Sequence, residues 1–182
     1  RLADMRLGVE CLLTDDPARA LAIAQQLDAF NRERRDIEAG MQEQALVLLE
    51  SLDTDSAAPG IALFDESWHE GVVGILASRI KDKLHRPVFA FARSEGGIVK
   101  GSGRSIPGLH LRDALDRVDK RHPGLINKFG GHAMAAGLSI AVGSHEIFGQ
   151  AFEAVVRELI DSGIRVVGTP DRLQEHLARI FP

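Results

Sequence analysis

Apolar residues in the first fifty positions recur at helical spacing. Residues 17–27, "PARALAIAQQL", place a proline where the first turn of a helix tolerates it, followed by good helix formers. A second, longer helix is predicted downstream from a series at steps of three and four, formed by Phe30, Arg34, Ile37, Met41, Ala45 and Leu48. Charged residues on its other faces, such as "RERRDIE", indicate a solvated surface. The polar segment 53–60, "DTDSAAPG", predicts a domain boundary.

The pattern changes after residue 60. A short apolar strand, a helix with one apolar side and a second apolar strand form a βαβ unit over 61–65, 71–85 and 86–92. The later elements are a strand ending in a glycine-rich turn, a short helix, a strand and a closing helix, over 96–105, 110–118, 137–142 and 144–160. The predicted fold class is α/β: a mixed β-sheet flanked by helices and preceded by a helical connecting segment.

Composition narrows the class of protein. With 182 residues, 45% of them hydrophobic, the chain can bury a core, and no apolar run is long enough for a transmembrane helix. The single cysteine, Cys11, has no disulfide partner, which favours a buried small hydrophobe in a reducing, cytoplasmic compartment. No Cys/His spacing, dense Asp/His cluster or nucleophile elbow is present. The residues therefore predict neither a metal site nor catalytic residues.

Charge is distributed unevenly along the chain. The net charge is −4, but residues 97–132 hold seven Lys and Arg against three Asp, a local charge of +4. A basic patch on an acidic body is typical of a site for an anionic ligand. Part of this charge lies on the predicted helix near 111–121, where plain solvation explains it equally well.

The first candidate motif is "KGSGRS", from Lys100 to Ser105. Two glycines around Ser102 allow backbone amides to approach an anion, while Ser105 and the Arg104 guanidinium donate to phosphate oxygens. The alternative interpretation is a β-bulge or a hairpin exit, where glycine is expected anyway.

The second candidate motif is "FGGHAMAAG". Gly130 and Gly131 can adopt positive φ, and the residues after them could open a helix whose free amides face an anion, with His132 as a further donor. The alternative is a glycine-rich turn in which small residues serve close packing. Trp68 and His69, in "SWHEGVVGI", are candidate cleft-lining residues, because Trp68 could stack a base; buried packing in a βα turn explains them as well.

Together and in this order, the motifs resemble the C-terminal half of the bacterial RecJ single-strand DNA exonucleases, of the DHH phosphoesterase superfamily. The resemblance rests on "WHEGVVGILASRIKDKLHRPVFAFA", "KGSGRSIPGLHLRDAL" and "KFGGHAMAAGLSI", with "RLADMRLGVECLL" and "AIAQQLDAFNRERRDIEAGM" similar to the end of that family's N-terminal domain and its connecting helix. It implies three parts: 1–57, the end of a catalytic domain and a long helix; 58–165, a DHH-associated substrate-binding α/β domain; and 166–182, a tail leading to a further domain.

The resemblance also implies a function. The intact enzyme hydrolyses single-stranded DNA from 5′ to 3′ in repair and recombination, with Mn²⁺ or Mg²⁺ held by an Asp/His cluster that this chain lacks. By resemblance, the phosphate contacts are Ser102, Gly103, Arg104, Ser105, Gly130, Gly131 and His132. The implied partners are single-stranded DNA and DNA-repair proteins, with no membrane. The chain is expected to be a fragment that is inactive alone. A relative acting on short oligonucleotides or nucleotide phosphates, and a non-catalytic nucleic-acid-binding domain, remain alternatives.

Overall fold

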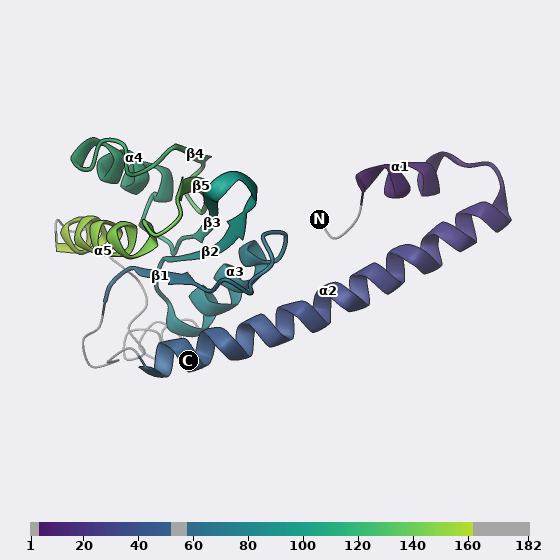
Figure 1. Ribbon diagram of the computed structural model, residues 1–182, viewed down its shortest axis with the longest axis horizontal. Coiled ribbons are helices and arrows are strands. Elements are labelled where there is room, and N and C mark those ends of the chain that lie inside the picture. The colour runs from purple at the N-terminus through teal and green to yellow at the C-terminus, as the bar shows by residue number, and fades with distance from the viewer. Residues whose placement is uncertain (1–3, 52–57, 162–182) are drawn as a thin grey trace, which may run out of the picture.

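The computed structural model describes residues 4–51 and 58–161, which form an α/β body and a long helical arm (Figure 1). The helices are α1 (Met5–Leu13), α2 (Pro17–Ser51), α3 (Val73–Leu84), α4 (Leu111–Arg121) and α5 (His145–Asp161). The strands are β1 (Ile61–Phe64), β2 (Val88–Ser94), β3 (Ile98–Arg104), β4 (Lys128–Gly131) and β5 (Ala135–Ala141). The predicted tail 166–182 and most of the predicted boundary 53–60 lie outside the described residues.

The strands form one mixed sheet in the order β1-β2-β3-β5-β4. The pair β1–β2 is parallel and connected through α3, as the βαβ prediction requires, and the other three pairs are antiparallel. The predicted fold class, a mixed sheet flanked by helices and preceded by a helical segment, is confirmed. Strand β5 lies between β3 and β4 and pairs with both. It therefore brings together β3 and β4, which are more than twenty residues apart in sequence.

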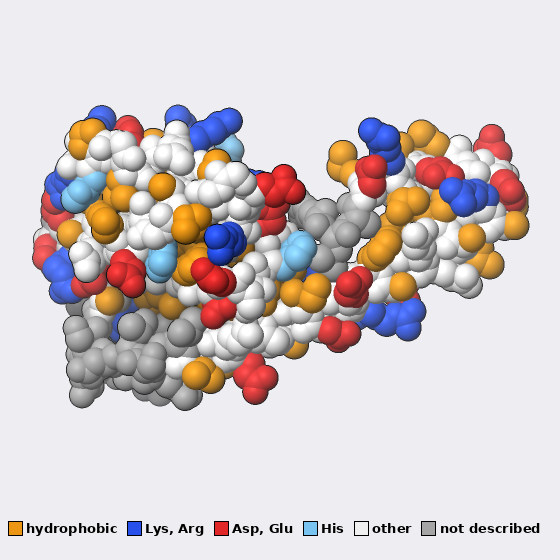
Figure 2. Space-filling view, viewed as in Figure 1, with side chains coloured by type: hydrophobic (Ala, Val, Ile, Leu, Met, Phe, Trp, Pro, Cys, Tyr) orange, Lys and Arg blue, Asp and Glu red, His pale blue; other side chains and the backbone are white. Residues whose placement is uncertain are grey.

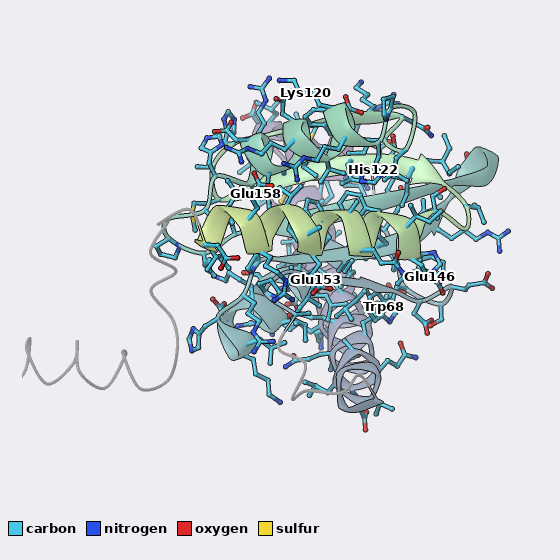
Figure 3. The ribbon with its side chains drawn as sticks, turned by 90° about the vertical axis from the view of Figure 1, so that its left-hand side faces the viewer. Trp68, Lys120, His122, Glu146, Glu153 and Glu158 are labelled. Atoms are coloured by element: carbon cyan, nitrogen blue, oxygen red, sulfur yellow. The ribbon has the colours of Figure 1, made fainter. Side chains whose placement is uncertain are left out.

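One face of the sheet is covered by α4 and α5, which lie side by side in Figure 3. Their core contains Phe89 and Phe91 of β2 against Phe148 and Phe152 of α5, with edge-to-face ring pairs whose centroids are 5.1 to 5.3 Å apart. Such pairs contribute about 1 kcal/mol beyond their apolar area. This face therefore carries the close-packed aromatic core of the domain.

The other face is covered only in part, by α3 and by the C-terminal half of α2 (Figure 1). Met41 and Ala45 of α2 are buried against the α3 side, together with Trp68, whose side chain is only 3% exposed. The Trp68 indole Nε1 donates to Gln44 Oε1 at 2.9 Å, which satisfies the one polar atom of that buried ring. This contact anchors α2 to the body.

The arm corrects two expectations. Residues 17–51 form one continuous helix rather than two, because nothing between Leu27 and Phe30 breaks a helix. Cys11 is half-buried rather than buried; its Sγ contacts the Ala20 carbonyl oxygen at 3.7 Å, where α1 packs on the start of α2. Figure 2 shows apolar side chains gathered on this arm, and Met5 and Leu12 are 83% and 86% exposed. None of the described helices is long and apolar enough to span a membrane.

Candidate functional site

A basic cavity of about 800 Å³ lies between α2, the N-terminal end of α3 and strand β3. It is lined by Arg34, Glu70, Gly71, Gly74, Ile75, Lys100, Ser102 and Arg104. Three of these side chains are cationic and one is a carboxylate. The cavity combines the "KGSGRS" segment with residues from two other elements.

Strand alternation places Ser102 and Arg104 on the cavity side of β3. The Arg104 guanidinium is partly buried; its Nη1 donates to Ser102 Oγ at 3.1 Å and to the Gly103 carbonyl oxygen at 2.8 Å. Burial lowers the pKa of Arg104, because desolvation disfavours its charged form. An anion in the cavity would offset that desolvation, and the guanidinium fork can bind two of its oxygens at once.

The α3 helix approaches this pair closely because residue 74 is glycine. A Cβ at Gly74 would lie 3.0 Å from Ser102 Oγ and 3.1 Å from Arg104 Nη2, so a side chain would push both groups by a few tenths of an ångström. Gly71 and Gly74 also bring the start of α3 to the cavity wall, where the positive end of the helix dipole favours negative charge.

Arg34 reaches the same cavity from α2. Its guanidinium is held by Asn31 Oδ1, at 3.0 Å from Nη2, and by Glu38 Oε2, at 2.9 Å from Nη1. Its side chain is 28% exposed, and Glu38 also accepts from Arg79 of α3 at 3.3 Å. These partners hold the Arg34 guanidinium in place. Arg34 of α2 and Arg104 of β3 therefore line the same cavity. Sequence reasoning treated the charges around Arg34 as solvated surface and did not select it.

Glu70 is the acidic group of the cavity, and it too was not selected from the sequence. Hydrogen bonds from Ser94 and Lys100 lower the pKa of Glu70, and burial opposes them only in part. The Glu70 carboxylate therefore stays ionised at neutral pH. Its Oε2 accepts from the Lys100 Nζ at 3.1 Å, with both side chains about half exposed.

Sheet register brings the second glycine motif beside the first. Gly137 of β5 is opposite Ser102 on one side and Gly130 on the other, and Ala136 is likewise between Gly103 and Gly131. Both predicted motifs thus meet across β5. The structure also corrects the form of each motif: Gly101 and Gly103 lie inside β3 rather than in a turn, and no helix opens after Gly131.

The two glycines of the second motif differ in their surroundings. Gly131 has φ of 146°, and a Cβ there would collide with Ala136, so geometry requires glycine. Gly130 has no atom within 4 Å of an added Cβ, and its φ is not in the positive region. Packing does not explain glycine at position 130. His132 is exposed in the β4–β5 turn, where its backbone N–H donates to the Ala135 carbonyl oxygen at 2.8 Å.

An open face extends from the cavity over β3, β5 and β4. It consists of Lys100, Ser102, Arg104, Ala135, Gly137, Ser139, Lys128 and Gly130, all of which alternate away from the α4–α5 core. The centre is flat, because β5 contributes only small side chains. Cationic residues stand on β3 and at the start of β4.

The remaining predicted residues lie away from the cavity. Gly103 and Ser105 are buried; Gly103 faces the Phe89 ring, and Ser105 Oγ donates to the Leu109 carbonyl oxygen at 2.7 Å. Trp68 is buried against α2 rather than presented to a ligand. His69 is half-buried, and its Nδ1 accepts from the Gly71 N–H at 3.0 Å, which shapes the turn into α3.

The described residues do not form a metal centre. Within 4–51 and 58–161, no group of three or more His, Cys, Asp or Glu side chains could hold a metal ion. The cavity offers one carboxylate, Glu70, among three cations. This donor set suits an anion rather than a divalent cation.

The chain thus combines a mixed α/β domain with a cavity lined by three cationic side chains and one carboxylate. Residues 57–161 match the family model of the DHHA1 domain, and the chain belongs to that family. The chain is 57% identical to the single-stranded-DNA-specific exonuclease RecJ of Dickeya dadantii over 164 residues, 89% of this chain and 28% of that protein. It is 52% identical to RecJ of Escherichia coli over 166 residues, 90% of this chain and 29% of that protein. The resemblance predicted from the motifs is confirmed.

Solved structures agree with this assignment. RecJ of Thermus thermophilus, with Mg²⁺ and separately with Mn²⁺, matches with a TM-score of 0.72 and 33% identity over 84% of this chain. The match covers 23% and 22% of those chains. The chain thus spans less than a third of the length of these relatives, and it is similar to one part of them.

Proposed function

We propose that this chain is the substrate-binding part of a 5′→3′ single-stranded DNA exonuclease, and that it holds the DNA by its phosphates. One observation carries the proposal: Arg34 and Arg104, from the connecting helix and from the sheet, line the same cavity with the Ser102 hydroxyl. Two guanidinium forks and a hydroxyl match the oxygens of a phosphate group. The similarity to RecJ exonucleases supports DNA as the source of that phosphate.

The open face supplies a path for the strand beyond the cavity. Gly130 and Gly137 are exposed and carry no side chain, so a sugar–phosphate backbone can lie directly on β4 and β5. His132, at the end of β4, stands beside this path as a further donor. Gly103, Gly131 and Ser105 contribute by fixing the backbone under the site. The domain thereby fixes the DNA in register, which is the part of catalysis that positioning supplies.

Hydrolysis itself is assigned to a part of the longer enzyme outside this chain. In this proposal that part binds Mn²⁺ or Mg²⁺, as expected from the metal-bound Thermus structures, and acts in cytoplasmic DNA repair and recombination with repair proteins. The exposed apolar residues of α1 and early α2, including Met5 and Leu12, are the surface on which we place it.

Binding measurements test the proposal against a preference for short ligands. We expect the chain to bind 5′-phosphorylated oligothymidylate more tightly than the unphosphorylated strand, with affinity falling as salt rises. Fluorescence anisotropy with a labelled strand, competed by a dinucleotide, measures both. Tighter binding of the dinucleotide than of the long strand would favour a phosphoesterase for short oligonucleotides. Equal affinity for the phosphorylated and unphosphorylated long strands would exclude recognition of the terminal 5′-phosphate.

Removing the Glu70 charge is expected to strengthen binding. Glu70→Gln leaves the side-chain shape and removes a negative charge beside the bound phosphate, an effect on the order of 1 kcal/mol or roughly fivefold in affinity. Because the pKa of Glu70 is lowered, the carboxylate is ionised throughout about pH 7 to 8, where the terminal phosphate also keeps its charge, so the gain should be constant there. It should shrink as pH falls below the ordinary range of glutamate, where Glu70 itself becomes protonated. Weaker binding by Glu70→Gln would instead assign Glu70 a direct contact.

A further inference from the structure

A second cationic row crosses the open face next to the phosphate cavity. Ser139 of β5 is directly opposite Lys100 of β3 on one side and Lys128 of β4 on the other. Residues opposite one another in a sheet point to the same face. Two lysines therefore flank a serine hydroxyl on the open face.

The two lysines differ in their partners. Lys100 Nζ contacts Glu70 at 3.1 Å, which draws it toward the cavity. Lys128 is exposed, and no carboxylate of the described residues lies within ion-pair distance of its ammonium. Lysine ammonium groups on flexible stems bind phosphates as point charges. Lys128 is thus available for an anion, and Lys100 can be shared between two.

The spacing of the rows matches that of a nucleic-acid strand. The Lys100–Ser139–Lys128 row is two residues from the Ser102–Gly137–Gly130 row, a separation of about 7 Å along the strands. Taken along β3, that step is close to the separation of neighbouring phosphates in an extended single strand. Lys128 lies two strands to the side of β3, at about 4.8 Å per strand, and its long side chain spans that offset toward the second position. Gly137 and Gly130 of the first row carry no side chain that would obstruct a sugar on the open face.

We infer that Lys128, with Ser139 and Lys100, forms a second phosphate subsite that binds the phosphodiester next to the terminal phosphate. This inference rests on the proposed function, because it takes the Ser102–Arg104 cavity as the site of the first phosphate. Its consequence is selectivity for length: a ligand with two phosphates occupies both subsites, and a mononucleotide occupies one.

The test compares thymidine 5′-phosphate with the 5′-phosphorylated thymidine dinucleotide. We expect wild type to bind the dinucleotide more tightly, and Lys128→Met to weaken dinucleotide binding about three- to tenfold while leaving the mononucleotide unchanged. The dependence of log affinity on log salt should fall by about 0.7 for the dinucleotide only. Isothermal titration calorimetry at several salt concentrations gives both quantities.

Lys120→Met is the matched control. Lys120 is an exposed lysine of α4 that pairs with Asp116 at 2.6 Å, and Figure 3 shows it on the α4–α5 side of the molecule. Equal effects of Lys128→Met and Lys120→Met would overturn the subsite, as would equal wild-type affinity for the two ligands. If Arg104→Met still abolishes mononucleotide binding in that case, the first phosphate site stands and only the second fails. If wild type binds neither ligand, the proposed function fails as well.

Discussion

Replacing Arg104 by methionine is expected to weaken binding of 5′-phosphorylated single-stranded DNA by about 30- to 100-fold. The guanidinium is partly buried and already oriented by Ser102 Oγ and the Gly103 carbonyl oxygen, so little entropy is lost when it binds a phosphate. Hydrogen bonds to charged groups contribute about 1.5 to 3 kcal/mol, and the loss of a bidentate pair lies near the upper end. Anisotropy titration with phosphorylated and unphosphorylated strands measures the effect.

Two variants separate the Arg104 contact from general charge. Arg104→Lys keeps the charge and loses the fork, so it should recover only part of the affinity. Arg157→Met removes an exposed α5 arginine that pairs with Glu153, far from the cavity, and should change binding little. If Arg104→Met and Arg157→Met weaken binding equally, the phosphate is bound elsewhere. A loss that is identical for the unphosphorylated strand would show that Arg104 contacts the internal backbone instead of the 5′ end.

Replacing Gly103 by alanine is expected to destabilise the domain by about 3 kcal/mol. The added Cβ points into the α4–α5 core and collides with the Phe89 ring, close to Leu111. Phe89 cannot move aside, because its ring is packed edge-on against both Phe148 and Phe152. Overpacking of a close-packed core costs about 1 to 3 kcal/mol and more where neighbours are rigid. Urea unfolding followed by circular dichroism measures the shift in midpoint.

Gly130→Ala provides the contrasting case on the same sheet. Its Cβ would meet no atom within 4 Å, so stability should change by less than about 0.5 kcal/mol. Binding of single-stranded DNA should nevertheless weaken, because the methyl group raises the flat floor on which the strand is proposed to lie. A Gly130→Ala protein with unchanged DNA affinity would remove β4 from the binding path. A Gly103→Ala protein as stable as wild type would show that the phenylalanine cluster can relax.

Local sequence signals predicted most elements because each depends on short-range physics. Apolar spacing gave the βαβ unit, the helix over 111–121 and the closing helix, and β1, β2, β3 and β5 lie within or close to the predicted ranges. The second glycine motif could not be classified this way, since a strand, a turn and a helix start all accept Gly130 and Gly131. Only pairing with β5 selects the strand.

Arg34 shows where a sequence signal existed but was not used. It occupies a position in the apolar series Phe30, Arg34, Ile37 and Met41, where a charge is unexpected on a packed face. The structure supplies the reason: that face of α2 runs from the core contact at Met41 to the cavity at Arg34. A cationic residue within an otherwise apolar series therefore indicates a candidate binding site where a helix runs from a buried core to a cavity.

The sequence by itself determined the α/β class, the family, and Ser102 and Arg104 as candidate phosphate contacts. These signals depend on apolar periodicity and on short motifs, which involve only residues close together in sequence. The tertiary structure alone decided which residues line the candidate cavity. The strand order places β5 between the two glycine motifs, and α2, anchored through Trp68 and Gln44, places Arg34 at the cavity that Arg104 lines. It also separated the roles of two glycines: Gly103 leaves space for the Phe89 ring in the core, whereas Gly130 lies on the open face with no atom within 4 Å of an added Cβ. Those roles depend on neighbours distant in sequence, and no local pattern encodes them.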